Sequence, residues 1–274
     1  MAARTIDTTT TDLLARVEDG VAVITMNRPD RRNAFSNEML AAMGKVLVEV
    51  EAADDVHCVV MTGAAGAFSA GGDVKSFAEG ASQEGEFEAG VRSQRASQRA
   101  TTGALWAMSK PTIAALPGAT AGGGLGLALA CDMRVAAEGT VISTAFAKVG
   151  FPGDWGVTWL LTHLVGPSKA KELLYFADRI DAAEAHRIGL VNRVWPAASF
   201  EQQWSELASR LAAGPPIALG YMKENVNRVV SGGLGLEEFM DVEVVYHRRC
   251  GLTEDHLEAS RAFVAKRDPV FRGR

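Results

Sequence analysis

Apolar and polar positions alternate in blocks along the first 200 residues of the chain. Short apolar runs flanked by turn residues predict buried strands at residues 21–26, 58–61, 112–116, 134–137, 141–145 and 190–194. Between them, apolar side chains recur at helical spacing, and Ser36 can cap the first of these helices. Its apolar face holds Met39, Leu40, Met43, Val46, Leu47 and Val50. Further helices are predicted at residues 94–108, 125–130, 157–164 and 169–176.

The character of the chain changes near residue 199. From there on, helical periodicity dominates, and we expect helices at residues 199–213, 217–230, 236–250 and 254–266. Alternating strands and helices followed by helices alone predict an α/β core with a helical C-terminal region. We therefore expect a flexible tail at residues 1–12, a core at 13–198 and a helical region at 199–274, with a polar loop at 80–90.

Composition and charge exclude several classes of function. The net charge of −5 and the lack of a basic stripe argue against a nucleic-acid partner, and no apolar run has the length of a membrane span. Three separate cysteines without a CxxC pair suit a reducing compartment, and we expect the cytoplasm. The polar N-terminal residues show no apolar segment of signal-peptide type. The five histidines share no metal-ligand spacing, so we expect no metal.

Two glycine-rich segments are the most informative feature of the sequence. Residues 68–73 (FSAGGD) and 121–126 (AGGGLG) each follow a strand-like run and precede a helix-like segment. Glycine at such a junction leaves a backbone N–H unobstructed at the positive end of a helix. Two such groups converging on one oxygen would form an oxyanion hole, although ordinary loop punctuation also explains isolated glycines. Neither segment fits GxGxxG or GxxxxGK, so dinucleotide and P-loop sites lose support.

A series of ordered motifs makes the chain similar to the enoyl-CoA hydratase/isomerase (crotonase) superfamily from about residue 18 onward. The motifs are NRPDRRNA at 27–34, FSAGGDV at 68–74, KPTIAA at 110–115, GGG at 122–124, ACD at 130–132, LVG at 164–166, AAEA at 182–185, GLVN at 189–192 and FVAKR at 263–267. The resemblance implies a superhelix of ββα turns and a C-terminal helical region that mediates trimer packing. It implies an acyl-CoA substrate, no cofactor beyond the coenzyme A of that substrate, and a homotrimer or a dimer of trimers.

The resemblance also assigns residues to the binding site. The two oxyanion donors fall on the N–H groups of Gly72 and Gly123. The path of the nucleotide and pantetheine is lined by Arg32, Ala34, Ala70 and Val74. Asp73, beside the first donor, is either a general base or a carboxylate that caps the following helix and shapes the turn.

The acid–base residue decides which reaction is expected. Family hydratases hold water between two glutamates, but the matching positions here carry Gly126 and Phe146. Asp154 remains, at the position of a proton-shuttling aspartate in family isomerases and of a nucleophilic aspartate in aryl-CoA dehalogenases. It precedes a predicted helix and could instead be a plain N-cap.

Aromatic residues surround Asp154 in the sequence and predict an apolar pocket; they are Phe146, Phe151, Trp155 and Trp159. Desolvation in such a pocket raises the pKa of a carboxyl group, whereas a helix N-terminus lowers it, and the sequence leaves this balance open. We expect an enoyl-CoA isomerase-type reaction through a thioester enolate, with Asp154 as the single acid–base group. Enoyl-CoA hydration, hydrolytic or dehalogenating attack on a CoA ester, and a catalytically silent acyl-CoA binder are the alternatives.

Overall fold

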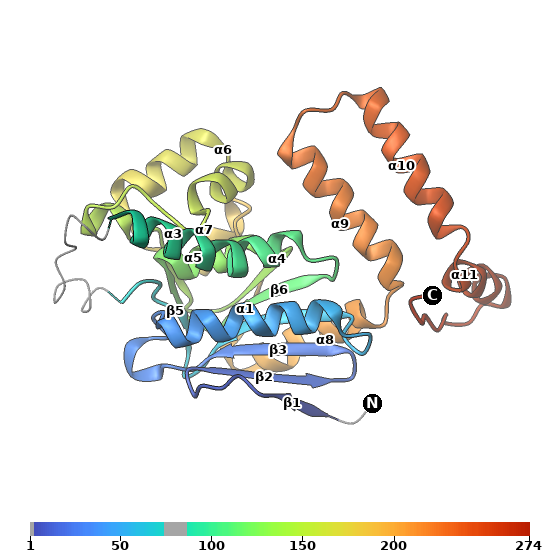
Figure 1. Cartoon of the computed structure of the whole chain (residues 1–274), viewed down its shortest axis with the longest axis horizontal. Coiled ribbons are helices and arrows are strands. Elements are labelled where there is room, and N and C mark those ends of the chain that lie inside the picture. The colour runs from blue at the N-terminus through green and yellow to red at the C-terminus, as the bar shows by residue number, and fades with distance from the viewer. Residues whose placement is uncertain (1–2, 74–86) are drawn as a thin grey trace.

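The computed structural model describes residues 3–73 and 87–274. In this part of the chain a large sheet of seven strands runs in the order β1-β2-β3-β4-β6-β8-β11 (Figure 1). Its strands are β1 (Arg4–Ile6), β2 (Leu13–Glu18), β3 (Val21–Met26), β4 (Cys58–Gly63), β6 (Thr112–Leu116), β8 (Met133–Ala137) and β11 (Arg193–Trp195). The first three strands are antiparallel, and β3 to β11 are parallel.

A smaller sheet of four described strands, in the order β10-β9-β7-β5, accompanies the large one. Its strands are β5 (Ala67–Ser69), β7 (Ala119–Ala121), β9 (Val141–Ser143) and β10 (Ile180–Asp181). The chain passes from the large sheet to the small one in three successive pairs, β4–β5, β6–β7 and β8–β9. Helix α5 (Gly122–Ala130) follows the second pair and α6 (Val157–Phe176) follows the third. This repetition confirms the predicted superhelix of ββα turns.

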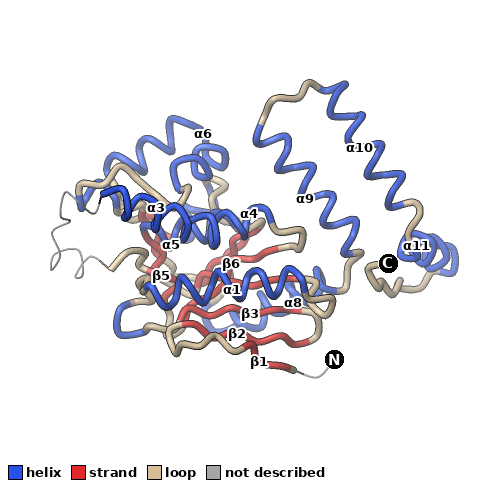
Figure 2. The backbone as a smooth tube through the Cα atoms, in the orientation of Figure 1, coloured by secondary structure: helices blue, strands red, loops and turns tan. Residues whose placement is uncertain are grey.

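Helices cover both faces of the large sheet (Figure 2). On one face, α1 (Asn37–Ala52) buries the apolar stripe predicted from the sequence, and Met39 N donates to its capping residue, Ser36 Oγ, at 3.1 Å. On the other face, α8 (Phe200–Ala212) buries Phe200, Trp204 and Leu207 against β3, β4 and β6. The remaining helices of the core are α3 (Phe87–Gln98), α4 (Ala104–Ala107) and α7 (Ala182–Arg187), and a π-helical turn (Arg99–Gly103) joins α3 to α4.

Three helices extend away from the core on the C-terminal side: α9 (Pro216–Ser231), α10 (Leu236–Cys250) and α11 (Glu254–Ala265) (Figure 1). Lys223 of α9 fastens this arm to the core, because its Nζ lies 3.1 Å from Asp132 Oδ1 and donates to the carbonyl oxygens of Leu105 and Lys110. A helical C-terminal region is thus present, as predicted. No helix of the described residues is long and apolar enough to cross a membrane.

Several elements differ from the sequence prediction. Residues 4–6, expected in a flexible tail, form β1, because they pair with β2 and bury Ile6. Helix α3 begins at Phe87, so the end of the expected loop at 80–90 is helical; residues 80–86 lie outside the described part. The strand expected at 190–194 begins only at Arg193, because Leu190 N and Val191 N both donate to Ala185 O in a turn. The helices expected at 157–164 and 169–176 are the two arms of α6, which kinks at Gly166.

Candidate active site

The two glycine segments lie side by side. They follow β5 and β7, which are neighbouring parallel strands of the small sheet, so both segments leave the same edge. Gly71 has a φ of +79°, and a Cβ there would lie only 2.6 Å from Gly123 N and 2.7 Å from Ala121 O. Only glycine allows the two backbones to approach this closely.

One pocket of about 820 Å³ contains most of the expected site. Gly72, Gly123 and Asp154 all line it, together with Ala70 and Asp73. A larger cavity of about 1200 Å³ lies between α9 and the core, but none of these five residues lines it. The smaller pocket therefore unites the glycine amides with a carboxyl group.

Both glycine amides remain available as donors. Helix α5 begins at Gly122, so Gly123 N belongs to the first turn, where amides have no acceptor within the helix. Its N-cap residue, Ala121, supplies no side-chain acceptor either. Gly72 N donates to no described residue, whereas the preceding Gly71 N donates to Ser69 Oγ at 3.1 Å. Among the described residues, the N–H groups of Gly72 and Gly123 in this pocket thus have no acceptor, and that of Gly123 lies at the positive end of a helix.

Asn33 fixes the loop that carries the first glycine segment. Its side chain is fully buried, and Nδ2 donates to Ala67 O at 2.8 Å and to Ala64 O at 3.0 Å. Ser69 Oγ donates to Asn33 O at 2.7 Å. Asn33 belongs to the 27–34 motif, but the sequence alone predicts no role for it. The structure shows that it joins the 27–34 motif to β5, which leads directly to Gly71 and Gly72.

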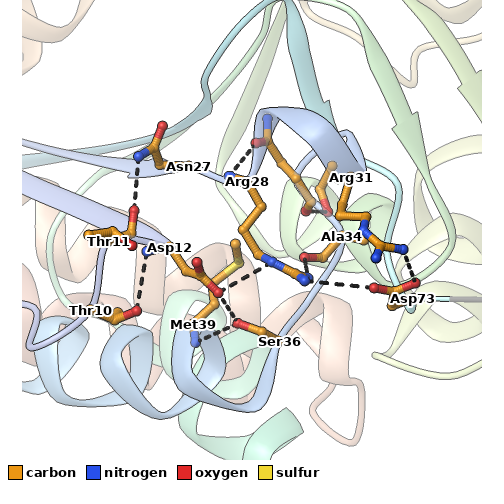
Figure 3. A network of polar contacts seen from close by, with 12 residues as sticks. Thr10, Thr11, Asp12, Asn27, Arg28, Arg31, Ala34, Ser36, Met39 and Asp73 are labelled. Carbon is orange, nitrogen blue, oxygen red and sulfur yellow. Dashed lines mark hydrogen bonds and ion pairs between the residues drawn. The ribbon is translucent and has the colours of Figure 1, made fainter. Parts of the chain in front are cut away.

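Asp73 belongs to a network of charged groups beside the pocket (Figure 3). Its Oδ2 lies 3.7 Å from a terminal nitrogen of Arg28, and its Oδ1 lies 3.9 Å from one of Arg31. Arg28 also donates to Ala34 O at 2.7 Å and lies 3.3 Å from Asp12 Oδ2. The Asp73 carboxylate therefore joins the first glycine segment to the 28–34 loop. The helix that it was expected to cap lies outside the described residues.

The remaining expected binding residues are placed differently. Ala70 lines the pocket, but Ala34 is buried and Arg32 is exposed, and neither is part of its lining. Arg32 adopts a φ of +50°, as does its neighbour Asn33 at +56°. Val74 lies outside the described residues. The structure thus brings Ala70, Gly72, Asp73 and Gly123 together in the pocket lining, whereas Arg32 and Ala34 lie outside that lining.

Asp154 lies in a constrained segment before α6. Trp155 has a φ of +51°, which is unfavourable for a residue with a side chain, and it is flanked by Gly153 at +119° and Gly156 at +72°. Such strained positions cluster at functional sites. The N-cap of α6 is Gly156, and no side chain caps this helix. The carboxyl group of Asp154 is therefore not the N-cap that the sequence allowed.

The two oxygens of Asp154 have different surroundings. Oδ2 accepts a hydrogen bond from Gln94 Nε2 of α3 at 3.1 Å, whereas Oδ1 is buried and has no partner among the described residues. Burial raises the pKa of Asp154 to about 6, and the bond from Gln94 partly opposes this rise. The sequence left the direction of this shift open. A carboxyl group that titrates near 6 can both accept and return a proton close to neutral pH.

Aromatic rings occupy the region where family hydratases would carry carboxylates. A Cβ at position 126 would lie 2.4 Å from Trp155 O and 2.7 Å from Trp155 Cβ, so Gly126 allows this segment to approach α5. Phe146 is buried with 6% of its surface exposed, and it lines the pocket. The Trp155 ring lies against Gly123 and meets Phe35 edge-on, with centroids 4.9 Å apart. The pocket is therefore apolar around the second glycine segment.

Two of the predicted aromatic residues contribute less to this pocket. Phe151 lines it but is 51% exposed. Trp159 is 42% exposed and contacts Trp106 and His163 instead, with centroid distances of 5.1 Å and 4.2 Å. Because Trp159 lies on α6 beyond Gly156, its ring packs toward α4. Among the described residues, no group of three or more histidine, cysteine, aspartate or glutamate side chains could hold a metal ion.

Comparison with known proteins agrees with this geometry. The profile of the family described as enoyl-CoA hydratase/isomerase matches residues 16–274. The chain belongs to this family. It is 33% identical over 262 residues to the 1,2-epoxyphenylacetyl-CoA isomerase of Escherichia coli (strain K12), which covers 96% of this chain and 98% of the relative. It is also 35% identical over 214 residues to the 4-chlorobenzoyl coenzyme A dehalogenase-1 of Arthrobacter sp, covering 78% and 76% of the two chains.

Comparison with solved structures identifies the same fold. An enoyl-CoA hydratase from Polaromonas sp. JS666 superposes with a TM-score of 0.88 at 31% identity, covering 94% of this chain and 99% of that one. The chain is therefore an acyl-CoA-processing enzyme of the enoyl-CoA hydratase/isomerase family with the crotonase fold. The relatives differ in their named reactions, so the choice among reactions rests on the pocket of this chain.

Gln94 is a pocket residue that the sequence analysis missed. It lies on α3, 60 positions before Asp154, and no motif or glycine pattern marks it. Only the packing of α3 over the pocket reveals the contact. Trp155, by contrast, was expected to make the pocket apolar, and the structure adds that it fills the space beside Gly126.

Proposed function

We propose that this family member catalyses an enoyl-CoA isomerase-type reaction in which Asp154 is the single acid–base group. The observation that carries the proposal is the buried, unpartnered Oδ1 of Asp154 in the same pocket as the free amides of Gly72 and Gly123. The absence of carboxyl groups at positions 126 and 146 supports it further, because a two-glutamate water site has no place there.

In the proposed mechanism the N–H groups of Gly72 and Gly123 donate to the thioester oxygen of the bound acyl-CoA. Asp154 Oδ1 takes a proton from a carbon of the acyl chain, and the electron pair moves toward the thioester to form an enolate. The two amides stabilise the negative oxygen, and the loss of one such donor typically raises the barrier by about 3 kcal/mol. The protonated Asp154 then returns the proton to another carbon, so that the double bond has moved and no atom is gained or lost.

Binding of the coenzyme A portion supplies the energy that orients the acyl chain. In this proposal Ala70 and Asp73, which line the pocket beside Gly72, contact the pantetheine arm. The apolar rings of Phe35, Phe146 and Trp155 exclude water from the enolate, which strengthens the hydrogen bonds from the amides.

The test combines 3-enoyl-CoA and 2-enoyl-CoA substrates with deuterated buffer. Wild-type enzyme should move the double bond and incorporate deuterium, and Asp154→Asn should slow both by roughly 10²- to 10⁴-fold, the usual contribution of an acid–base group. The exposed Asp178 provides the matched control, and Asp178→Asn should retain the wild-type rate. Unchanged turnover in Asp154→Asn would remove Asp154 from the mechanism.

The same assay separates the other reactions. Hydration would consume the enoyl absorbance and yield a 3-hydroxyacyl-CoA. Nucleophilic attack by Asp154 on a CoA ester would leave a covalent aspartyl adduct, detectable by mass spectrometry when turnover is trapped. A catalytically silent protein would bind acyl-CoA esters without turnover across the panel. Each of these results would replace the isomerase proposal.

We also propose that the C-terminal arm packs against other copies of the chain in a homotrimer or a dimer of trimers. The support is a set of large apolar side chains on this arm that the single chain leaves exposed. They include Met222 and Val226 on α9, Leu236 and Val244 on α10, and Phe263 and Val264 on α11. A concentration of large exposed apolar side chains on one arm is typical of protein interfaces.

A further inference from the structure

Helix α3 presents a polar face to the pocket. Gly90, Ser93, Gln94 and Ser97 all line it, at positions i, i+3, i+4 and i+7 of one helical face. Apolar residues of the segment after β9, such as Phe146, Phe151 and Pro152, also line the pocket. A polar helical face in a pocket with apolar lining suggests that α3 does more than close the pocket.

Gln94 is the member of this face that contacts the proposed acid–base group. Its Nε2 donates to Asp154 Oδ2 at 3.1 Å, across 60 positions of sequence. An amide donor on one carboxylate oxygen fixes the plane of the group and leaves the other oxygen free. Here the free oxygen is Oδ1, which is buried and has no partner among the described residues. The contact therefore makes the two oxygens of Asp154 unequal.

The π-helical turn after α3 sets the orientation of this face. It spans Arg99–Gly103 and buries Thr101 and Thr102, and Thr101 Oγ1 donates to Ser97 O at 2.7 Å. A π turn contains one residue more than an α turn, so it rotates the preceding helix by about 100°, the angle of one residue in a 3.6-residue turn. Without this turn the face that holds Gln94 would be rotated by about 100° from its present direction. Such turns are frequently found at functional sites.

We propose that Gln94 is a positioning residue that holds Asp154 Oδ2 so that Oδ1 faces the substrate. The inference rests on the proposed function, because it assumes that Asp154 transfers the proton. Among the described residues, the other charged side chains of the pocket lining are Arg28, Asp73 and Glu38. Arg28 and Asp73 form an ion pair, and Glu38 lies on the first turn of α1. Burial and Gln94 are the influences on the pKa of Asp154.

Two substitutions at Gln94 are expected to shift the pKa of Asp154 in opposite directions. Gln94→Leu removes it, so the ionised form loses its stabilisation and the acid limb of the kcat/KM profile should move up by about one pH unit. Gln94→Lys places a cation beside Asp154, so the same limb should move down. Gln98→Leu, one turn further along α3 and outside the pocket lining, is the control and should leave the profile in place. Thermal unfolding checks that all three variants fold.

A second readout does not depend on turnover. Difference infrared spectroscopy of wild type, Gln94→Leu, Gln94→Lys and the Gln98→Leu control, each compared with its Asp154→Asn counterpart, reports the titration of the Asp154 carboxyl group directly. A higher pKa in Gln94→Leu and a lower one in Gln94→Lys support the inference. Identical titrations in the three proteins, or an equal shift in Gln98→Leu, overturn it. If Asp154→Asn retains full turnover, the proposed function fails, and the infrared titration still decides whether Gln94 controls this carboxyl group.

Discussion

Asp132, after α5, and Asp154, before α6, are both partly buried aspartates whose pKa is raised by burial. Their partners differ. Asp132 Oδ1 lies 3.1 Å from Lys223 Nζ, and its Oδ2 accepts a hydrogen bond from Thr112 N at 2.7 Å. Among the described residues, Asp154 has one donor, Gln94, on Oδ2 and no partner on Oδ1. Burial raises both pKa values, but both oxygens of Asp132 are satisfied in a structural anchor, whereas the proposed acid–base group keeps one oxygen without a described partner.

The surroundings of the two groups fit these roles. Lys223, whose side chain is 7% exposed, joins Asp132 to two backbone carbonyl groups and so fixes α9 to the core. Its three contacts use the full donor capacity of an ammonium group. Around Asp154 the backbone is strained and the neighbouring rings are apolar. One region is arranged for stability, and the other holds a buried carboxylate oxygen that no described residue satisfies.

The largest expected effect comes from breaking the anchor. Lys223→Met leaves Asp132 and two carbonyl groups without their donor, so the free energy of unfolding should fall by about 3–5 kcal/mol, the usual effect of removing one partner of a buried pair. Denaturant titration measures it. Lys169→Met, which removes a surface ion pair to Glu172, should change stability by less than about 1 kcal/mol. Equal effects of the two substitutions would contradict the anchoring role of Lys223.

A smaller effect is expected from moving Asp154 without altering it. Gly126→Ala places a Cβ 2.4 Å from Trp155 O, which forces the segment carrying Asp154 away from α5. Turnover should fall by roughly 10- to 100-fold, because a displacement of about 1 Å can have this effect on a reacting group. Gly103→Ala adds the same atom at an uncrowded position, 3.6 Å from Gln98 O, and should keep the wild-type rate. Steady-state kinetics distinguishes the two variants.

The smallest expected effect is the change in folding stability with pH that Asp154 causes. The pKa of Asp154 is raised to about 6 in the folded protein, so the folded state binds this proton more tightly than the unfolded state does. Its contribution to stability is therefore present at low pH and is lost as the pH rises through about 6. Asp154→Asn should be more stable than wild type at pH 8, with the difference vanishing toward pH 4. Urea unfolding at both pH values measures this difference.

Much of the fold could be predicted from local patterns. Continuous apolar runs predicted the strands at 21–26 and 112–116, and helical periodicity after the cap residue Ser36 predicted the first helix. The structure has all three at the expected places. The three-residue strands β5 and β7 were missed because their pairing in the small sheet, rather than their composition, makes them strands. Residues 4–6 were assigned to a tail for the same reason, since only β2 holds them.

The site was predictable where backbone chemistry determines it. Glycine pairs at strand ends predicted the contact between the two segments, because no other residue permits that approach. The direction of the Asp154 pKa shift was not predictable, since it depends on how deeply the carboxyl group is buried. Gln94 was not predictable either, because a π-helical turn on another part of the chain directs it to Asp154.

The close approach of Trp155 to Gly126 also limits how this pocket can change its chemistry over evolutionary time. A glutamate introduced at position 126 alone would collide with the main chain of Trp155, so a single substitution cannot install a water-binding carboxylate there. The 153–156 segment would have to withdraw first, and that movement would displace Asp154 before any replacement was in place. Positions 126 and 155 are therefore coupled, and a carboxylate at position 126 requires a second change that withdraws the 153–156 segment.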